Sequence, residues 1–81
     1  MDTRIAVIAI IVEDTSCVEE LNALLHEYGQ YIIGRMGIPY REKNISLISV
    51  AVDAPMDTIS ALTGRLGRIS GLTVKTAYSK N

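Results

Sequence analysis

The stretch that decides the fold is Arg4–Val12, RIAVIAIIV, in which every residue after the arginine is apolar. Alternating apolar and polar residues would indicate a strand with one wet face, whereas this unbroken run predicts a strand buried on both faces. A second apolar run, ISLISVAVD, covers Ile45–Asp53. We expect these two strands to lie at the centre of a sheet.

A helix is expected after the first of these strands. Asp14 or Thr15 would cap it, because a short side-chain oxygen can accept from the free backbone N–H groups of a first turn. Ser16 with Glu19 offers an alternative capping box, and Gly29 is expected to end the helix. Apolar residues recur at helical spacing at Val18, Leu21, Leu25 and Tyr28.

A second helix is expected after Ile45–Asp53. Pro55 suits its first turn, and Gly67 is expected to be its C-terminal cap. Between these two residues the apolar side chains fall on one helical face. They are Met56, Ile59, Leu62 and Leu66.

Two further strands complete the pattern. Tyr31–Pro39 contains Gly34 and Gly37, and glycine within a strand marks a bulge or a close backbone approach, so we expect an irregular edge strand there. The polar segment Pro39–Asn44 is predicted to be a hairpin loop. Leu72–Tyr78, LTVKTAY, alternates between apolar and polar residues and predicts the last strand.

The resulting order, βαββαβ, predicts an α+β fold. With right-handed crossovers it forms a ferredoxin-like sandwich, a four-stranded antiparallel sheet with two helices on one face. The first and third strands would be central and the second and fourth would be edges. Because the chain has only 81 residues, we expect residues 1–81 to form a single domain.

The fold leaves one face of the sheet without helices. One alternate set of the first strand must point to that face, and a soluble monomer rarely exposes so broad an apolar patch. The two possible sets are Ile5, Val7, Ala9 and Ile11, or Ala6, Ile8, Ile10 and Val12. We therefore expect a homo-oligomer, a dimer or larger, in which a second sheet covers this face.

Composition excludes several functional classes. Eight basic and nine acidic residues give a net charge of −1, which argues against direct binding to nucleic acid. No apolar run reaches the roughly 18 residues that span a bilayer, so a cytoplasmic protein without membrane attachment is expected.

Cys17 and His26 are the single residues of their types, too few for a metal site. We expect Cys17 to be a buried hydrophobe and His26 a helix-surface residue, and we predict no cofactor and no catalytic residue.

Charge is unevenly distributed along the chain. Residues 1–30 hold one basic residue against six acidic ones, whereas residues 31–81 hold seven basic against three acidic. Attraction between an acidic first helix and a basic second helix is one interpretation. The other is a basic docking face formed by Arg65, Arg68, Lys75 and Lys80.

The chain resembles a known family in two segments, RMGIPYREKN (Arg35–Asn44) and DTISALTGRLGRISGLTVKTAYSK (Asp57–Lys80), and also at Val12–Asp14 and Asn22–His26. That family is the iron-only hydrogenase system regulators, and the resemblance covers essentially the whole chain. It implies an ACT-like version of the ferredoxin-like fold, similar to the ligand-binding domain of nickel-responsive repressors. It also implies association into dimers or tetramers through the sheets.

The leading hypothesis is a non-enzymatic, oligomeric regulatory module that senses a small ligand or docks to a protein partner. A small enzyme with an active site at the subunit interface is the alternative, and a deep pocket reached by His26 would favour it. A purely structural assembly subunit is a third possibility.

A binding site is expected around the second strand and its turn. Glycine lets backbone approach closely, and arginine is a strong partner for carboxylate or phosphate. Together with the loop after the first strand, this places a ligand or partner site at the border between subunits. Its expected residues are Asp14, Thr15, Arg35, Gly37 and Arg41.

Overall fold

The computed structural model describes residues 2–80. Its elements are β1 (Arg4–Val12), α1 (Val18–Glu27), β2 (Ile32–Tyr40), β3 (Ile45–Ala54), α2 (Met56–Gly67) and β4 (Leu72–Tyr78), with short 3₁₀ turns η1 (Thr15–Cys17), η2 (Gly29–Tyr31) and η3 (Arg41–Lys43). All strand pairs are antiparallel, and the strand order is β2-β3-β1-β4. The predicted ferredoxin-like, ACT-like sandwich is therefore confirmed, with β1 and β3 at its centre.

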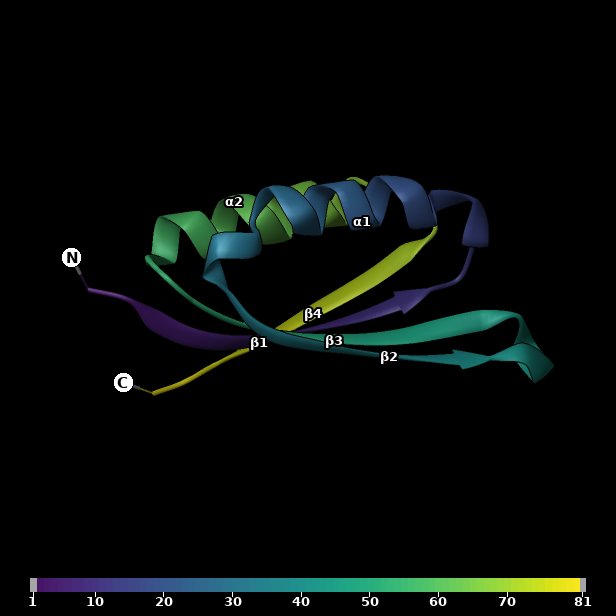
Figure 1. Cartoon of the computed structure of the whole chain (residues 1–81), viewed down its shortest axis with the longest axis horizontal. Helices are drawn as coiled ribbons and strands as arrows, with labels where there is room; N and C mark the ends of the chain where they lie inside the picture. Colours follow the sequence, from purple (N-terminus) through teal and green to yellow (C-terminus); the bar gives the residue numbers. More distant parts are fainter. Residues whose placement is uncertain (1, 81) are drawn as a thin grey trace.

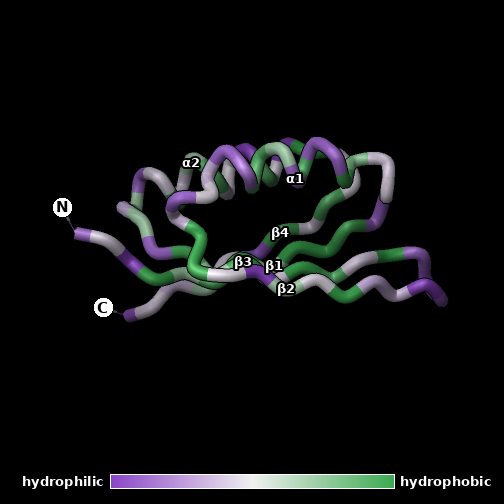
Figure 2. Tube along the Cα trace, in the orientation of Figure 1, coloured by the Kyte–Doolittle hydropathy of each residue, from purple (hydrophilic) through white to green (hydrophobic). Residues whose placement is uncertain are grey.

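Both helices cover the same face of the sheet (Figure 1). The side chains of β1 that point toward them are fully buried, and Val50, Val52 and Ala54 of β3 join them. Leu21, Leu24 and Leu25 of α1 and Ile59, Leu62 and Leu66 of α2 close this core from above. Figure 2 shows the hydrophobic residues running along β1, while hydrophobic and hydrophilic residues alternate along the helices.

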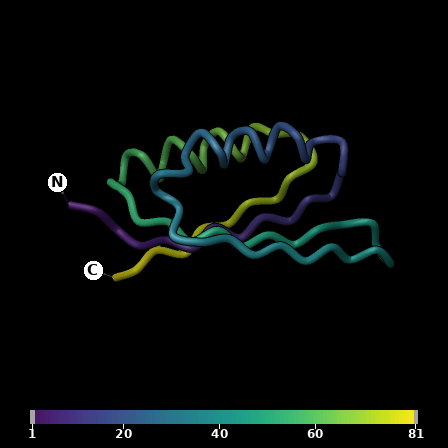
Figure 3. Tube along the Cα trace, viewed as in Figure 1, coloured from purple at the N-terminus to yellow at the C-terminus, as the bar shows by residue number. Residues whose placement is uncertain are grey.

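The start of β1 and the end of β4 lie together, far from the β2–β3 hairpin (Figure 1). Ala6, near the start of β1, pairs with Tyr78 at the end of β4. At the other end of the sheet the hairpin between β2 and β3 projects beyond the helices (Figure 3). Over residues 2–80, neither helix has the length and apolar character needed to cross a membrane.

The β1–α1 junction is built on a capping aspartate. The Ser16 N–H donates to Asp14 Oδ1 at 2.9 Å, and this hydrogen bond holds the pKa of the carboxyl below its usual value. Asp14, one of the expected capping residues, thus caps the 3₁₀ turn η1 that leads into α1, whereas the N-cap of α1 itself is Cys17, which makes no side-chain capping bond. The first residue of α1 is Val18, and the Ser16–Glu19 capping box does not form.

The expected glycine caps were wrong in place. Neither Gly29 nor Gly67 has a positive φ. The C-cap of α1 is Tyr28, and the C-cap of α2 is Arg68, one residue after Gly67. Within residues 2–80, the glycine with a left-handed backbone is Gly71, with φ of 94°, in the turn before β4. A Cβ atom there would lie 2.7 Å from the Cβ of Asp14, so this turn needs glycine for space as well as for conformation.

The edge strand β2 is irregular, as expected. Its register with β3 shifts between Ile32 and Gly34, which places a bulge at Ile33. The strand continues past Pro39 to Tyr40, one residue further than predicted, because Pro39 still pairs with Ser46. The hairpin then turns through η3 and Asn44, whose φ of 56° is one that asparagine tolerates better than most residues.

A substitution at Gly71 tests the β1–α1 junction. Gly71→Ala forces a side chain into a positive φ and against Asp14, and should lower the free energy of unfolding by roughly 2 kcal/mol or more. Gly29→Ala is the control, because open space surrounds Gly29 and its φ is negative. Urea unfolding followed by circular dichroism measures both variants. Equal midpoints for the two would contradict the close approach.

Candidate functional site: the uncovered face of the sheet

The face of the sheet opposite the helices is apolar and uncovered. On β1 the outward set is Ile5, Val7, Ala9 and Ile11, the first of the two sets that the sequence left open. The side chains of Ile5 and Val7 are 43% and 42% exposed, whereas Ile8, in the same strand but on the helix side of the sheet, is 0% exposed. The same strand is therefore sealed on one side and open on the other.

The neighbouring strands extend this uncovered face. Leu47 of β3 pairs with Ile11 of β1 and with Ile38 of β2, so the three side chains form one row across the sheet. Met36 of β2 pairs with Ser49 of β3 and lies in the next row. Met36 and Ile38 are 65% and 57% exposed, which makes β2 the most open part of the face.

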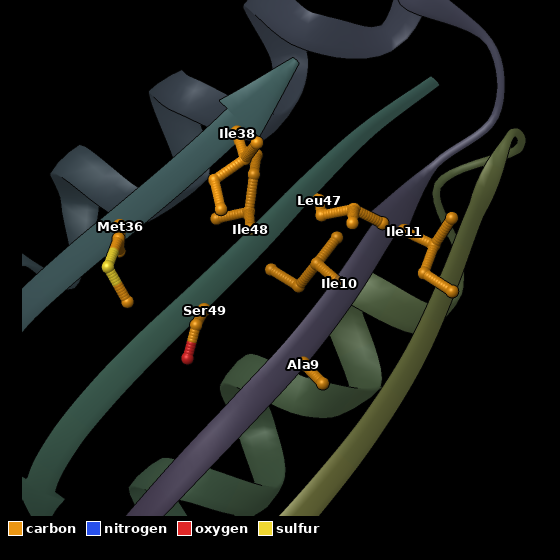
Figure 4. Close-up of a pocket in the computed structure, with 8 residues that line it drawn as sticks. All are labelled: Ala9, Ile10, Ile11, Met36, Ile38, Leu47, Ile48 and Ser49. Carbon is orange, nitrogen blue, oxygen red and sulfur yellow. The ribbon is translucent and has the colours of Figure 1, made fainter. Parts of the chain in front are cut away.

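Small residues at the centre of the face leave it hollowed. Ala9 and Ser49 pair across β1 and β3, between larger side chains. Beside them lies a shallow hollow of about 240 Å³, whose walls include Met36, Ile38 and Leu47 (Figure 4). A second hollow of about 230 Å³ shares Met36 and Ser49 with the first. The two together form a trough that the Met36 side chain borders.

Charged groups lie around this apolar centre rather than within it. Lys75 of β4 pairs with Ala9 at one edge, and Asp53 pairs with Ile5 at one end of the strands. At the other end, the Thr73 hydroxyl donates to the Glu13 carboxylate. An apolar centre with a polar rim is the usual anatomy of a protein–protein interface.

The five predicted binding residues lie in three places. Arg35 and Gly37 pair with Val50 and Ile48, so they are on the helix side of β2, away from the uncovered face. Arg35 Nη2 donates to Asn22 Oδ1 on α1 at 3.0 Å. Arg41 belongs to the hairpin turn η3, while Asp14 and Thr15 lie at the β1–α1 junction. Their joint use as a binding site stays a prediction.

The residues that shape the trough are not among the five predicted binding residues. Met36, Ile38 and Leu47 are ordinary apolar residues, and nothing in their local sequence distinguishes them. The alternation of side chains along β2 and β3 shows which residues face the trough only once the register between the strands is known. The bulge at Ile33 also breaks the alternation along β2.

The opposite charges of the two helices meet at one ion pair. Arg65 of α2 donates through both Nη atoms to the Glu27 carboxylate of α1, with one of the two contacts at 3.2 Å. The guanidinium also lies over the Tyr28 ring, 5.6 Å from its centroid. Attraction between the helices is thus observed at Arg65. Arg65 and Lys75 lie on opposite sides of the molecule, so the alternative of a single basic docking face is not supported.

The single cysteine and histidine differ in burial. Cys17 is buried, and its thiol donates to the Asp14 carbonyl at 2.9 Å. Burial, followed by the nearby Asp14 carboxylate, raises the pKa of this thiol, which suits a structural role. His26 is exposed on α1 and lines neither hollow of the sheet face. Within residues 2–80, no group of three or more His, Cys, Asp or Glu could hold a metal ion.

Comparison with known families gives one match over most of the chain. The TM1266-like family model, described as "Iron-only hydrogenase system regulator, putative", matches residues 4–76. The structure of uncharacterized protein TM1266 from Thermotoga maritima is similar, with a TM-score of 0.93 and 38% sequence identity. The likeness covers 98% of this chain and 100% of that one. No curated protein matches this chain.

Two more distant structures share the fold. A formyltetrahydrofolate deformylase from Pseudomonas putida KT2440 has a TM-score of 0.68 at 18% identity, over 99% of this chain and 30% of that one. CPII, a nitrogen regulatory PII-like protein from Thiomonas intermedia K12, has a TM-score of 0.59 at 17% identity, over 98% and 99% of the two chains. At these identities the likeness concerns the fold alone.

The ion pair between the helices predicts a dependence of stability on pH. The Arg65 guanidinium holds the pKa of Glu27 below its ordinary value of 4.5. The stability from this pair is therefore present above pH 4.5 and is lost as the pH falls through the lowered pKa of the folded state. Glu27→Gln should lower the melting temperature at pH 7 and leave it nearly unchanged at pH 2, as measured by calorimetry. An equal difference at both pH values would contradict this.

Proposed function

This chain belongs to the TM1266-like family, and we propose that it is a non-enzymatic regulatory module that works as an oligomer, assembled through the uncovered face of its sheet. One observation carries the proposal, namely that β1 is sealed on its helix side and equally apolar on its open side. Each Å² of apolar surface withdrawn from water stabilises an assembly by about 25 cal/mol. A second sheet on this face would remove that surface from water.

The size of the face supports this assembly. Figure 1 is drawn down the shortest axis, with the helices above the sheet, so the shortest extent runs across the strands. The extents of 42 Å and 17 Å therefore bound the face. Their product, on the order of 700 Å², is an upper limit on the projected area of the face, of the same order as the roughly 800 Å² of accessible surface that each partner contributes to a standard interface.

The hollows favour a regulatory module over an enzyme. Ser49 is the hydroxyl-bearing residue among the mainly apolar walls of both hollows. Acid–base catalysis needs a titratable group within reach of its substrate, and His26 lies on the far side of the molecule from these walls. An active site at the subunit interface is the alternative function.

A small effector is compatible with this fold. The PII-like protein that shares it is bound to ADP, AMP and bicarbonate. In our chain, the effector or protein partner would bind at a border between subunits that includes Asp14, Thr15, Arg35, Gly37 and Arg41. By its family, the protein would act on an iron-only hydrogenase system, and it would do so from the cytoplasm.

Native mass spectrometry of the purified chain tests the assembly. The wild type should give a mass of at least twice 8.8 kDa. Lysines at two open positions of β1, Val7→Lys with Ile11→Lys, should lower the subunit number, because two charges would be buried in the interface. Ala61→Lys, on the exposed side of α2, is the control and should keep the wild-type mass. A monomeric wild type at micromolar concentration would refute the proposal.

The binding residues have their own test. Protein purified from its own host should retain extra mass from an effector, and Arg35→Ala with Arg41→Ala should lose that mass while keeping the subunit number. Both side chains are exposed, so the double variant should unfold within about 1 kcal/mol of the wild type. Arg68→Ala is the control. Retention of the same mass by the double variant would contradict this site.

A further inference from the structure

The two edges of the sheet differ in how well they could pair with another strand. Within residues 2–80, β2 pairs with β3 and β4 pairs with β1, so each has one unpaired side. The edge of β2 is interrupted by the bulge at Ile33 and by Pro39, which lacks an N–H. Such interruptions are how proteins prevent edge-to-edge association. β4 has neither, since its seven residues contain no glycine or proline and pair regularly with β1.

The backbone groups on the open side of β4 follow from its bonds to β1. Gly71 accepts from the Glu13 N–H and the Ser79 N–H donates to Ile5, both at 2.8 Å. In an antiparallel ladder the backbone N–H and C=O groups of residues two apart point toward the same neighbouring strand. The odd-numbered residues of β4 therefore bond to β1. The N–H and C=O groups of the even-numbered residues therefore point away from the sheet. These residues are Leu72, Val74, Thr76 and Tyr78.

The side of α2 next to this edge carries no charge. Arg65 marks the opposite side of α2, where it reaches Glu27 of α1. Met56 marks the β4 side, because Arg4 contacts both the Met56 sulfur and the Ser79 carbonyl. At helical spacing from Met56, the same side is formed by Ser60, Thr63 and Gly67. A Cβ on Gly67 would meet nothing within 4 Å, so this flank is open.

From these observations we infer that β4 is a second self-association surface, on which two copies of the chain pair their β4 strands antiparallel into one continuous eight-stranded sheet. Strands in a sheet are about 4.8 Å apart. Because α2 contacts β1 and β3 as well as β4, its axis lies inward of the β4 edge, and the two α2 helices could approach to the roughly 8–10 Å at which helices pack. Small uncharged residues on the flank permit that approach. An isolated peptide strand would leave the flank uncovered, which is why a second copy fits better.

Charge selects the register of this pairing. A two-fold axis at Lys75 would set two ammonium groups directly opposite each other, which is destabilising. An axis at Val74 instead places Lys75 opposite Thr73 of the partner subunit. It also pairs the half-buried Val74 side chains beneath the helices, and so withdraws more apolar surface from water.

This surface is separate from the uncovered face, so the inference adds to the proposed function and rests on it for the complete assembly. Pairing at the edge and stacking of the faces use perpendicular two-fold axes, which together generate a tetramer with closed symmetry. The wild type is expected to have a mass four times 8.8 kDa.

Proline at the open edge is the first test. Val74→Pro removes an N–H that points away from β1, and proline is tolerated at such positions of an edge strand. It should halve the mass in native mass spectrometry, while Val74→Ala, which loses the same side chain but keeps the N–H, should stay tetrameric. A Val74→Pro chain of wild-type mass would overturn the inference.

Cysteine pairing tests the register without relying on proline. Thr73 and the partner's Lys75 would form a pair not joined by hydrogen bonds, with Cα atoms within the range that a disulfide spans. Mixed Thr73→Cys and Lys75→Cys chains should therefore give a disulfide-linked dimer on mild oxidation, and neither variant should do so alone. The wild type, whose Cys17 is buried, is the control. A dimer of Lys75→Cys alone, or none from the mixture, would refute the Val74 axis.

The subunit numbers of the two variants distinguish a failure of the proposed face from a failure of the proposed edge. Loss of subunits in Val7→Lys with Ile11→Lys but not in Val74→Pro would leave the proposed function standing and refute the edge. Loss in Val74→Pro alone would refute the face and retain the edge.

Discussion

The burial of β1 is the constraint on which the rest of the structure depends. This strand is apolar on both sides, and it must lie at the centre of the sheet for its backbone and side chains to be covered. α1 and α2 cover one side with leucine and isoleucine, and the capping by Asp14 and the close turn at Gly71 fix how the chain leaves β1 and returns to β4. The other side is uncovered, and it is the side that the proposed assembly would cover.

Much of the fold could be predicted because each element carries a local signal. The unbroken apolar run of Arg4–Val12 and the helical spacing of the apolar residues after it gave the element order, and chirality gave the topology. The glycine turn could not be placed in the same way. Gly29 and Gly67 stand where a helix cap is usual, whereas the need for glycine at Gly71 comes from Asp14, 57 residues earlier in the chain.

The candidate site was harder to predict for a related reason. Either alternate set of β1 is apolar, so hydropathy cannot say which set faces the helices, and only the register with β3 decides it. Arg35 was expected at a subunit border because of its charge, but the bulge at Ile33 sets the side of β2 on which it lies. The sequence correctly predicted an apolar face on the sheet. The trough in that face could not be predicted, because it depends on pairings between residues distant in sequence.

Assembly through the open apolar face, as proposed, would also link folding to abundance. When association with a second copy stabilises the native state, the free energy of unfolding contains a term that grows with the logarithm of protein concentration. A chain at low concentration would be less stable and more readily degraded, and its folded population would rise steeply once enough copies are present. A regulator that assembles as proposed would respond to its own expression level before any effector binds.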